Sequence, residues 1–129
     1  MFAGRLGKKK GLQIARQLIA AGADVNFANS AEGTALKCAA EQASAEIVRL
    51  LVDNGADIDG PPGTGQTALM LAARNGDVPT IAVLIDNGAD RTLTCKLPWA
   101  ENRTAQGLAE LENRRAAVAY FKALDENLE

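Results

Sequence analysis

The chain has 129 residues, of which 47% are hydrophobic and 23% charged, and its formal net charge is −2. This composition fits one globular domain and excludes a disordered chain or a strongly basic nucleic-acid binder. The sequence contains no histidine, which excludes imidazole general bases, His-activated nucleophiles and His-ligated metals. Its two cysteines form no CxxC pattern, so neither a disulfide framework nor a cysteine zinc site is expected. No apolar run approaches the roughly 18 residues of a membrane span.

From its first residues onward the sequence repeats itself with a period of 33 residues. One phrase occurs three times at this spacing, as LIAAGADVN (18–26), LVDNGADID (51–59) and LIDNGADRT (84–92). A second phrase occurs twice, as TALKCAAE (34–41) and TALMLAAR (67–74). A weaker copy, TAQGLAEL (104–111), follows after 37 residues, so an insertion lies within 93–103. At the start, MFAGR (1–5) aligns weakly with MLAAR (70–74), which predicts that the chain begins inside the first helix of a repeat.

Each repeat is predicted to fold as a pair of helices. A threonine precedes each short apolar run and is expected to cap the first helix, at Thr34, Thr67 and Thr104. The second helix has apolar residues at helical spacing and is expected to end before a glycine with left-handed backbone, at Gly22, Gly55 and Gly88. The turn-rich connection that follows each glycine is suited to an outward hairpin.

This pattern resembles the ankyrin repeat, whose TPLHLAA helix start and GADVN hairpin entry occur here as TALKCAA or TALMLAA and as GADVN or GADID. The resemblance covers nearly the whole chain and implies an all-α fold, a solenoid of stacked helix-turn-helix units with outward hairpin loops. We place a partial first repeat at 1–25, a second at 26–58, a third at 59–91 and a fourth, with the inserted hairpin, at 92–129. Lys37 and Met70 replace the family's histidine, so its hydrogen bonds between repeats are missing and lower stability is expected.

The two ends of the stack look different in the sequence. In the fourth repeat Glu110 replaces the second small alanine, as expected of a terminal repeat without a following neighbour. The C-terminal helix can turn Val118, Phe121 and Leu124 inward and its charged residues to water. The N-terminal end, with lysines at 8–10, leaves two interpretations open: a truncated chain that lacks an upstream cap, or a degenerate cap that its lysines shield.

The segment GPPGTGQT (60–67) is similar to the phosphate loop of AAA-type ATPases. However, Gln66 stands where that loop needs a lysine, and the segment follows a helix end rather than a strand. We interpret it as a hairpin tip and expect no nucleotide, metal or other cofactor. Cys38, in the first helix of the second repeat, is expected to be buried, and Cys95, in the inserted loop, is expected to be exposed.

The resemblance implies a non-enzymatic module that binds a partner protein through hairpin tips and the concave flank of the first helices. Carried over by position, the partner-binding residues are Phe27, Asn29, Glu32, Thr64, Gln66, Trp99 and Arg103 in the hairpins and Glu41, Gln42, Arg74, Asn75 and Glu112 on the helix flank, which Leu111 shares. Two interpretations of Trp99 stay open, a binding residue or a packing residue that covers the last repeat.

An adaptor, an inhibitor and a toxin-neutralising protein all fit this pattern. The alternative is a regulatory or targeting ankyrin segment of a larger enzyme or effector protein. We expect no nucleic-acid or membrane partner and a monomeric chain, with weak self-association through an uncapped N-terminal repeat as the alternative. Because no secretory signal pattern is visible, a cytoplasmic location is expected.

Overall fold

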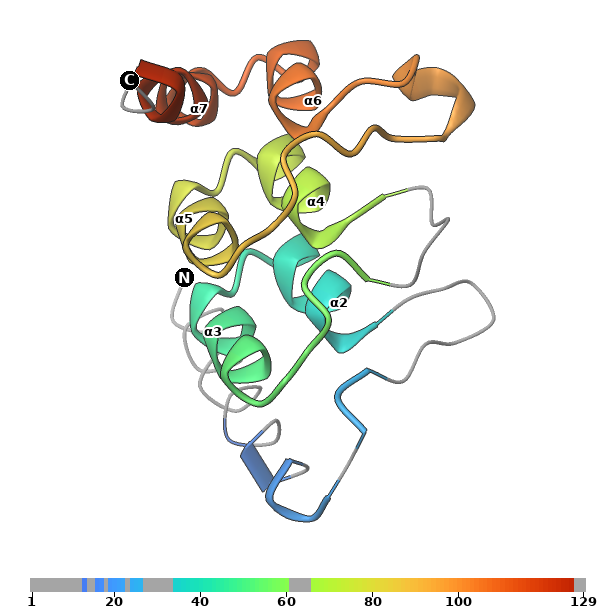
Figure 1. The fold of residues 1–129 in the computed structure, drawn as a ribbon, viewed down its shortest axis with the longest axis vertical. Coiled ribbons are helices and arrows are strands. Elements are labelled where there is room, and N and C mark those ends of the chain that lie inside the picture. Colours follow the sequence, from blue (N-terminus) through green and yellow to red (C-terminus); the bar gives the residue numbers. More distant parts are fainter. Residues whose placement is uncertain are drawn as a thin grey trace.

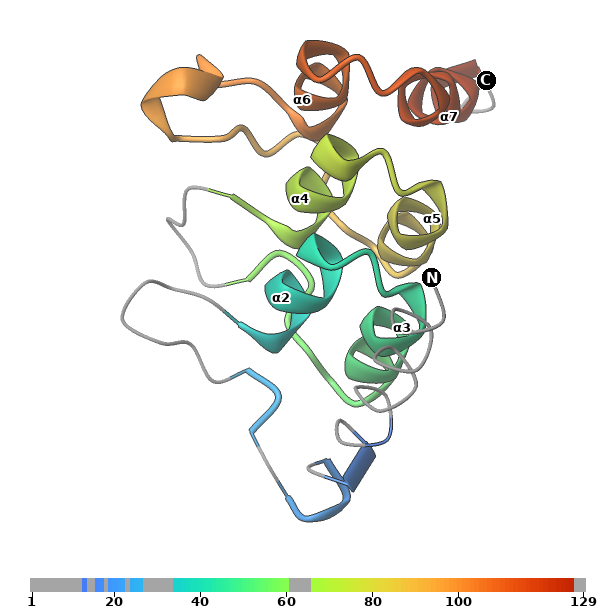
Figure 2. The same cartoon turned by 180° about the vertical axis from the view of Figure 1, so that it is seen from behind.

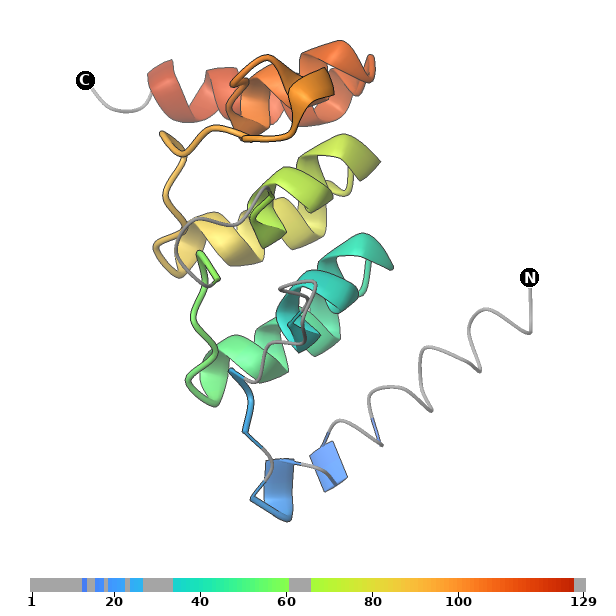
Figure 3. The same ribbon diagram turned by 90° about the vertical axis from the view of Figure 1, so that its right-hand side faces the viewer.

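The computed structural model describes residues 34–60 and 66–126, together with 13, 16, 17, 19–22 and 24–26. These residues contain the six helices α2 (Ala35–Glu41), α3 (Ala45–Asp53), α4 (Ala68–Asn75), α5 (Val78–Asp86), α6 (Ala105–Leu111) and α7 (Arg115–Glu126), and the 3₁₀ turn η1 (Pro98–Ala100). Helices α2, α4 and α6 form one column, and α3, α5 and α7 form a second column beside it (Figure 1). Seen from the side, each pair of helices is one layer of a stack (Figure 3). The predicted all-α fold is confirmed for the described part of the chain.

The first helix of each pair starts at the predicted threonine. The side-chain oxygens of Thr34, Thr67 and Thr104 accept hydrogen bonds from the backbone N–H three residues later, at 3.2, 3.2 and 3.3 Å. In the middle layer the bond is reciprocated, because the Thr67 N–H donates to Met70 Sδ at 3.4 Å. These bonds satisfy N–H groups that a helix start leaves without a partner, which is why the threonines fix the helix boundaries.

The second helix of a pair ends where the glycines predict. Gly55 has a φ of +92° and its N–H donates to the Val52 carbonyl at 3.1 Å. The next N–H, of Ala56, donates to the Leu51 carbonyl at 3.0 Å. The same two bonds recur after α5 at Gly88, also with φ +92°. This closing pattern needs a left-handed residue, which glycine supplies without steric cost.

One side of each first helix faces the preceding layer. The first residue after the capping threonine is buried in α4 and α6, where Ala68 and Ala105 are 1% and 2% exposed, but its counterpart Ala35 in α2 is exposed. The fourth residue after the threonine follows the same rule, since Leu108 in α6 is fully buried and Cys38 in α2 is exposed. Only α4 and α6 have a first helix before them in the described part of the chain. These two positions therefore pack against the layer before.

The opposite side of each first helix faces the following layer. The second and sixth residues after the capping threonine lie on this side. In α2 they are Leu36 and Ala40, which are 2% and 0% exposed, and their counterparts in α4 are equally buried. In α6 the same positions hold Gln106, which is half-buried, and Glu110, which is exposed. Glu110 therefore lies on the outer face of the last described layer, as its polarity predicted.

The predictions for both cysteines are wrong. Cys38 is exposed because it lies on the side of α2 that faces the preceding layer, and no helix in the described residues covers that side. Cys95 is fully buried because the inserted segment folds back on itself. Its N–H donates to the Arg103 carbonyl at 2.8 Å, next to an antiparallel bridge between Thr94 and Thr104. Cys95 thus packs into the apolar core instead of facing water.

Polar side chains join consecutive layers along the connecting segments. The Asn26 side-chain oxygen Oδ1 accepts from the Asp57 N–H at 2.6 Å, and the side-chain Nδ2 donates to the Gly55 carbonyl at 3.1 Å. One repeat later, at the equivalent position, an Asp59 carboxylate oxygen accepts from the Asp90 N–H at 3.0 Å. The GAD aspartate itself forms a local turn, as Asp90 accepts from the Thr92 N–H at 2.8 Å.

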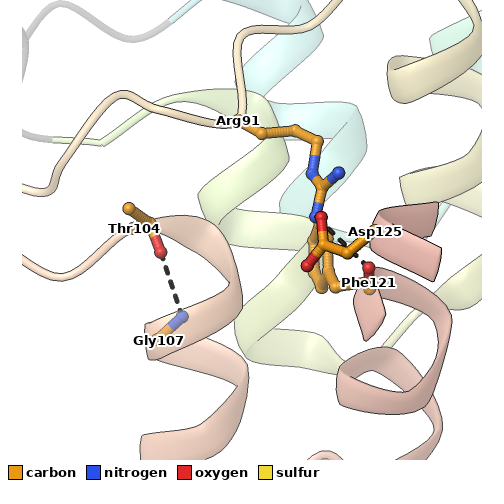
Figure 4. A network of polar contacts seen from close by, with 5 residues as sticks. All are labelled: Arg91, Thr104, Gly107, Phe121 and Asp125. Carbon is orange, nitrogen blue, oxygen red and sulfur yellow. Dashed lines mark hydrogen bonds and ion pairs between the residues drawn. The ribbon is translucent and has the colours of Figure 1, made fainter. Parts of the chain in front are cut away.

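Arg91 links α7 to the connecting segment that follows α5. Its Nη2 lies 3.0 Å from an Asp125 carboxylate oxygen and donates to the Phe121 carbonyl at 3.3 Å (Figure 4). The guanidinium also lies 5.4 Å from the centroid of the Phe121 ring, which is fully buried. The prediction that Phe121 faces inward is confirmed, with Val118 and Leu124 half-buried beside it.

Candidate functional site

Eight of the twelve predicted partner-binding residues can be placed, because Phe27, Asn29, Glu32 and Thr64 lie outside the described residues. Of these eight, five are exposed and three are half-buried. The exposed ones are Glu41, Gln42, Asn75, Trp99 and Glu112, and the half-buried ones are Gln66, Arg74 and Arg103.

The C-terminal ends of the three first helices lie side by side. Because these helices stack in one column, residues at the same repeat position recur in each layer (Figure 2). Glu41, Arg74 and Leu111 occupy one such position, and Gln42, Asn75 and Glu112 the next. These six residues, with Gln66 and Trp99 from the connecting segments, are called the first-helix surface below.

Three of the predicted residues meet at one point of this surface. The Arg74 guanidinium lies 4.5 Å from the centroid of the Trp99 ring. Arg74 Nη1 donates to the Gln66 side-chain carbonyl at 3.2 Å. Gln66 precedes α4, Arg74 lies in its last turn, and Trp99 lies on η1. Sequence reasoning named all three residues but could not show that they touch.

Asn75 is engaged within the fold. Its side-chain amide donates to the carbonyls of Ala40 and Glu41, at 3.2 and 2.8 Å. These carbonyls belong to the last turn of α2, where a helix leaves its acceptors without partners. Arg114 does the same one layer later, since its Nε donates to the Arg74 carbonyl at 2.8 Å. Asn75 therefore links α4 to α2, a role that its sequence position does not reveal.

The exposed large apolar side chains lie in the inserted segment and at the end of α6. Among the residues that the structure describes, the large hydrophobic side chains classed as exposed are Leu93, Trp99 and Leu111, at 37%, 45% and 43%. Leu93 was missed by sequence reasoning. Its signal was an apolar residue at the start of the inserted segment 93–103.

A family model for ankyrin repeats, built of 3 copies, matches residues 1–95. The chain belongs to the ankyrin repeat family. The match stops before α6 and α7, so the structure adds a further helix pair to the matched ankyrin repeats. No curated protein matches the sequence. Ankyrin repeats are generally protein–protein interaction modules and are typically non-catalytic.

A hollow lies on the other column of this ankyrin stack, between α3 and α5. It has a volume of about 560 Å³ and is lined by Arg16 and by residues of α3 and α5, namely Ala45, Glu46, Arg49, Pro79, Ala82, Val83 and Asp86. Its two arginines and two carboxylates give it no dominant charge.

Within the described ranges, no group of three or more Cys, Asp or Glu residues is arranged to hold a metal ion. No helix there is long and apolar enough to cross a bilayer.

Proposed function

We propose that the chain is a non-enzymatic module that binds a partner protein through the first-helix surface. The observation that carries this proposal is the exposure of Trp99 and Leu111, at 45% and 43%, on a surface whose other members are polar. Protein interfaces combine a few large apolar residues with a polar rim, and tryptophan is strongly enriched among the residues that dominate binding energy. An adaptor, an inhibitor or a toxin-neutralising protein would all use such a surface.

The support beneath this surface favours the proposal. Ala40 and Ala73, directly before Glu41 and Arg74, are fully buried between the layers. Asn75 and Arg114 fasten the helix ends to one another. A rigid surface loses little conformational entropy when a partner binds, so more of the contact energy appears as affinity.

The test compares variants of the two faces in affinity capture from the native source, followed by mass spectrometry. Trp99→Ala and Leu111→Ala are expected to lose the partner that the unchanged chain retains. Arg49→Ala changes an exposed residue of α3 and is expected to keep it. Circular dichroism and thermal melting of all three should match the unchanged chain. A partner that all variants retain equally, or that only Arg49→Ala loses, would place the binding surface elsewhere.

A further inference from the structure

Arg74 carries a positive charge that no carboxylate neutralises within the described part of the chain. The ion pairs found there join Arg91 to Asp125 at 3.0 Å and Arg103 to Glu101 at 3.6 Å. Arg74 donates instead to the neutral Gln66 amide, and its Nε is buried without a hydrogen-bond partner. Burying part of a guanidinium without a carboxylate costs solvation free energy, and a carboxylate bound at its terminal nitrogens offsets part of that cost through charge-assisted hydrogen bonds, as Asp125 does for Arg91.

Trp99 holds this guanidinium in place. The ring lies 4.5 Å from the guanidinium carbon, the range of a favourable cation–π contact. The segment that carries Trp99 is itself fixed, because Ala100 and Cys95 on either side of it are fully buried. Since the cation is already oriented, a carboxylate that binds it does not have to order a flexible side chain.

An apolar contact point lies one layer away. Leu111 occupies in α6 the position that Arg74 occupies in α4, and the two helices pack directly against each other. Packed helix axes are about 8–10 Å apart, so a short segment of a partner can reach both residues. Leu111 is 43% exposed, and the ring of Trp99 adds further apolar surface.

We propose that Arg74 binds a carboxylate of the partner, and that the same partner segment places a bulky apolar side chain on Leu111 and Trp99. The inference rests on the proposed function and names the chemistry of the partner at that surface. The recognised element is a peptide segment with an aspartate or glutamate close to a leucine, isoleucine or phenylalanine.

The probe is a phage-displayed library of random peptides, selected on the purified chain. Selected peptides are then synthesised with their acidic residue intact and with Asp→Asn or Glu→Gln, and binding is measured by calorimetry. We expect the selected peptides to share an acidic residue near a large apolar one. Neutralising the acid should weaken binding about tenfold, as loss of a charge-assisted hydrogen bond does.

The variant Arg74→Gln should weaken binding of the acidic peptide by a similar factor. It should no longer distinguish the acidic peptide from its neutral version, because the two changes remove the same interaction. Arg49→Gln removes an equal charge from an exposed position on α3 and should leave both affinities unchanged. If Arg74→Gln lowers the melting temperature, Arg74→Lys takes its place, because it retains the charge. Comparison of the acidic peptide with its neutral version on the unchanged chain then still tests the contact.

The other outcomes separate the inference from the proposed function. Peptides that lose binding to Leu111→Ala and Trp99→Ala but lack an acid, or ignore Arg74→Gln, would overturn the carboxylate while the binding surface stands. Peptides that bind those two apolar variants as well as the unchanged chain would overturn both. A library without any binder would overturn the inference of a peptide segment, and the capture experiment would still decide the proposed function.

Discussion

The turn between the two helices of each layer depends on one residue with left-handed backbone. Equivalent positions hold Ala43, Gly76 and Asn113, with φ of +58°, +69° and +57°. For a residue with a side chain this conformation costs about 1–2 kcal/mol, and asparagine tolerates it better than alanine does. Ala43 is therefore the strained member of the three.

We predict that Ala43→Gly raises the free energy of unfolding by about 1 kcal/mol, because it removes this strain and adds only a small entropy cost in the unfolded chain. The reverse change at the next layer, Gly76→Ala, should lower it, since the new Cβ would lie 2.9 Å from Arg114 Cδ. Urea unfolding followed by circular dichroism measures both. Destabilisation by Ala43→Gly would contradict the left-handed turn.

At the scale of the helix, one turn of α6 carries both a leucine that packs in the core and a leucine that is exposed. Leu108 is fully buried, and Leu111, three residues later, is 43% exposed. We predict that Leu108→Ala lowers the free energy of unfolding by about 2–5 kcal/mol, the usual range for a leucine deleted from a core. Leu111→Ala should change it by no more than about 0.5 kcal/mol. Equal losses would mean that α6 is turned differently against α4.

The surroundings of Tyr120, on α7, shift the pKa of its phenol. Burial raises the pKa of the Tyr120 phenol above its ordinary value, the nearby Asp86 carboxylate raises it further, and the Arg91 guanidinium opposes the shift. The folded chain therefore keeps the phenol proton at a pH where the unfolded chain loses it. The stability that this provides is complete below the pKa of the unfolded chain and is lost as pH rises through the folded pKa.

Tyr120 is the only tyrosine of the chain, so the ultraviolet absorbance of tyrosinate follows this residue alone. We predict a midpoint above that of free tyrosine in the native chain and a midpoint closer to it in Asp86→Asn. Thermal stability should fall over the same alkaline range. A native midpoint equal to that of the urea-unfolded chain would show that α7 does not bury the phenol.

At the scale of the whole molecule, polar residues of α6 cover the outer face of the last described layer. Gln106 and Glu110 stand where α2 and α4 carry leucine and alanine that pack on the following layer. We predict that Gln106→Leu with Glu110→Ala exposes an apolar face and causes concentration-dependent self-association, measured by sedimentation velocity. Glu112→Ala, an exposed change outside that face, should remain as dispersed as the unchanged chain.

The features that the sequence predicted correctly are those fixed by local chemistry. A capping threonine and a closing glycine act on groups within a few residues, so Thr67 and Gly55 were placed without knowledge of their neighbours. The exposure of Cys38 depends on which layer covers its helix, and the burial of Cys95 depends on how the insertion folds back. The contact between Arg74 and Trp99 joins α4 to that insertion, between residues 25 positions apart. No periodic pattern encodes such a contact.

Because one cysteine is exposed and the other is buried, thiol labelling can measure local opening of the native structure. A thiol-reactive dye reaches Cys38 directly, whereas Cys95 can react only when the segment from Thr94 to Thr104 detaches from the core. The ratio of the two labelling rates would then measure how often that segment opens in the native state. Since the same segment carries Trp99, a ligand held there should slow the modification of Cys95 and leave that of Cys38 unchanged.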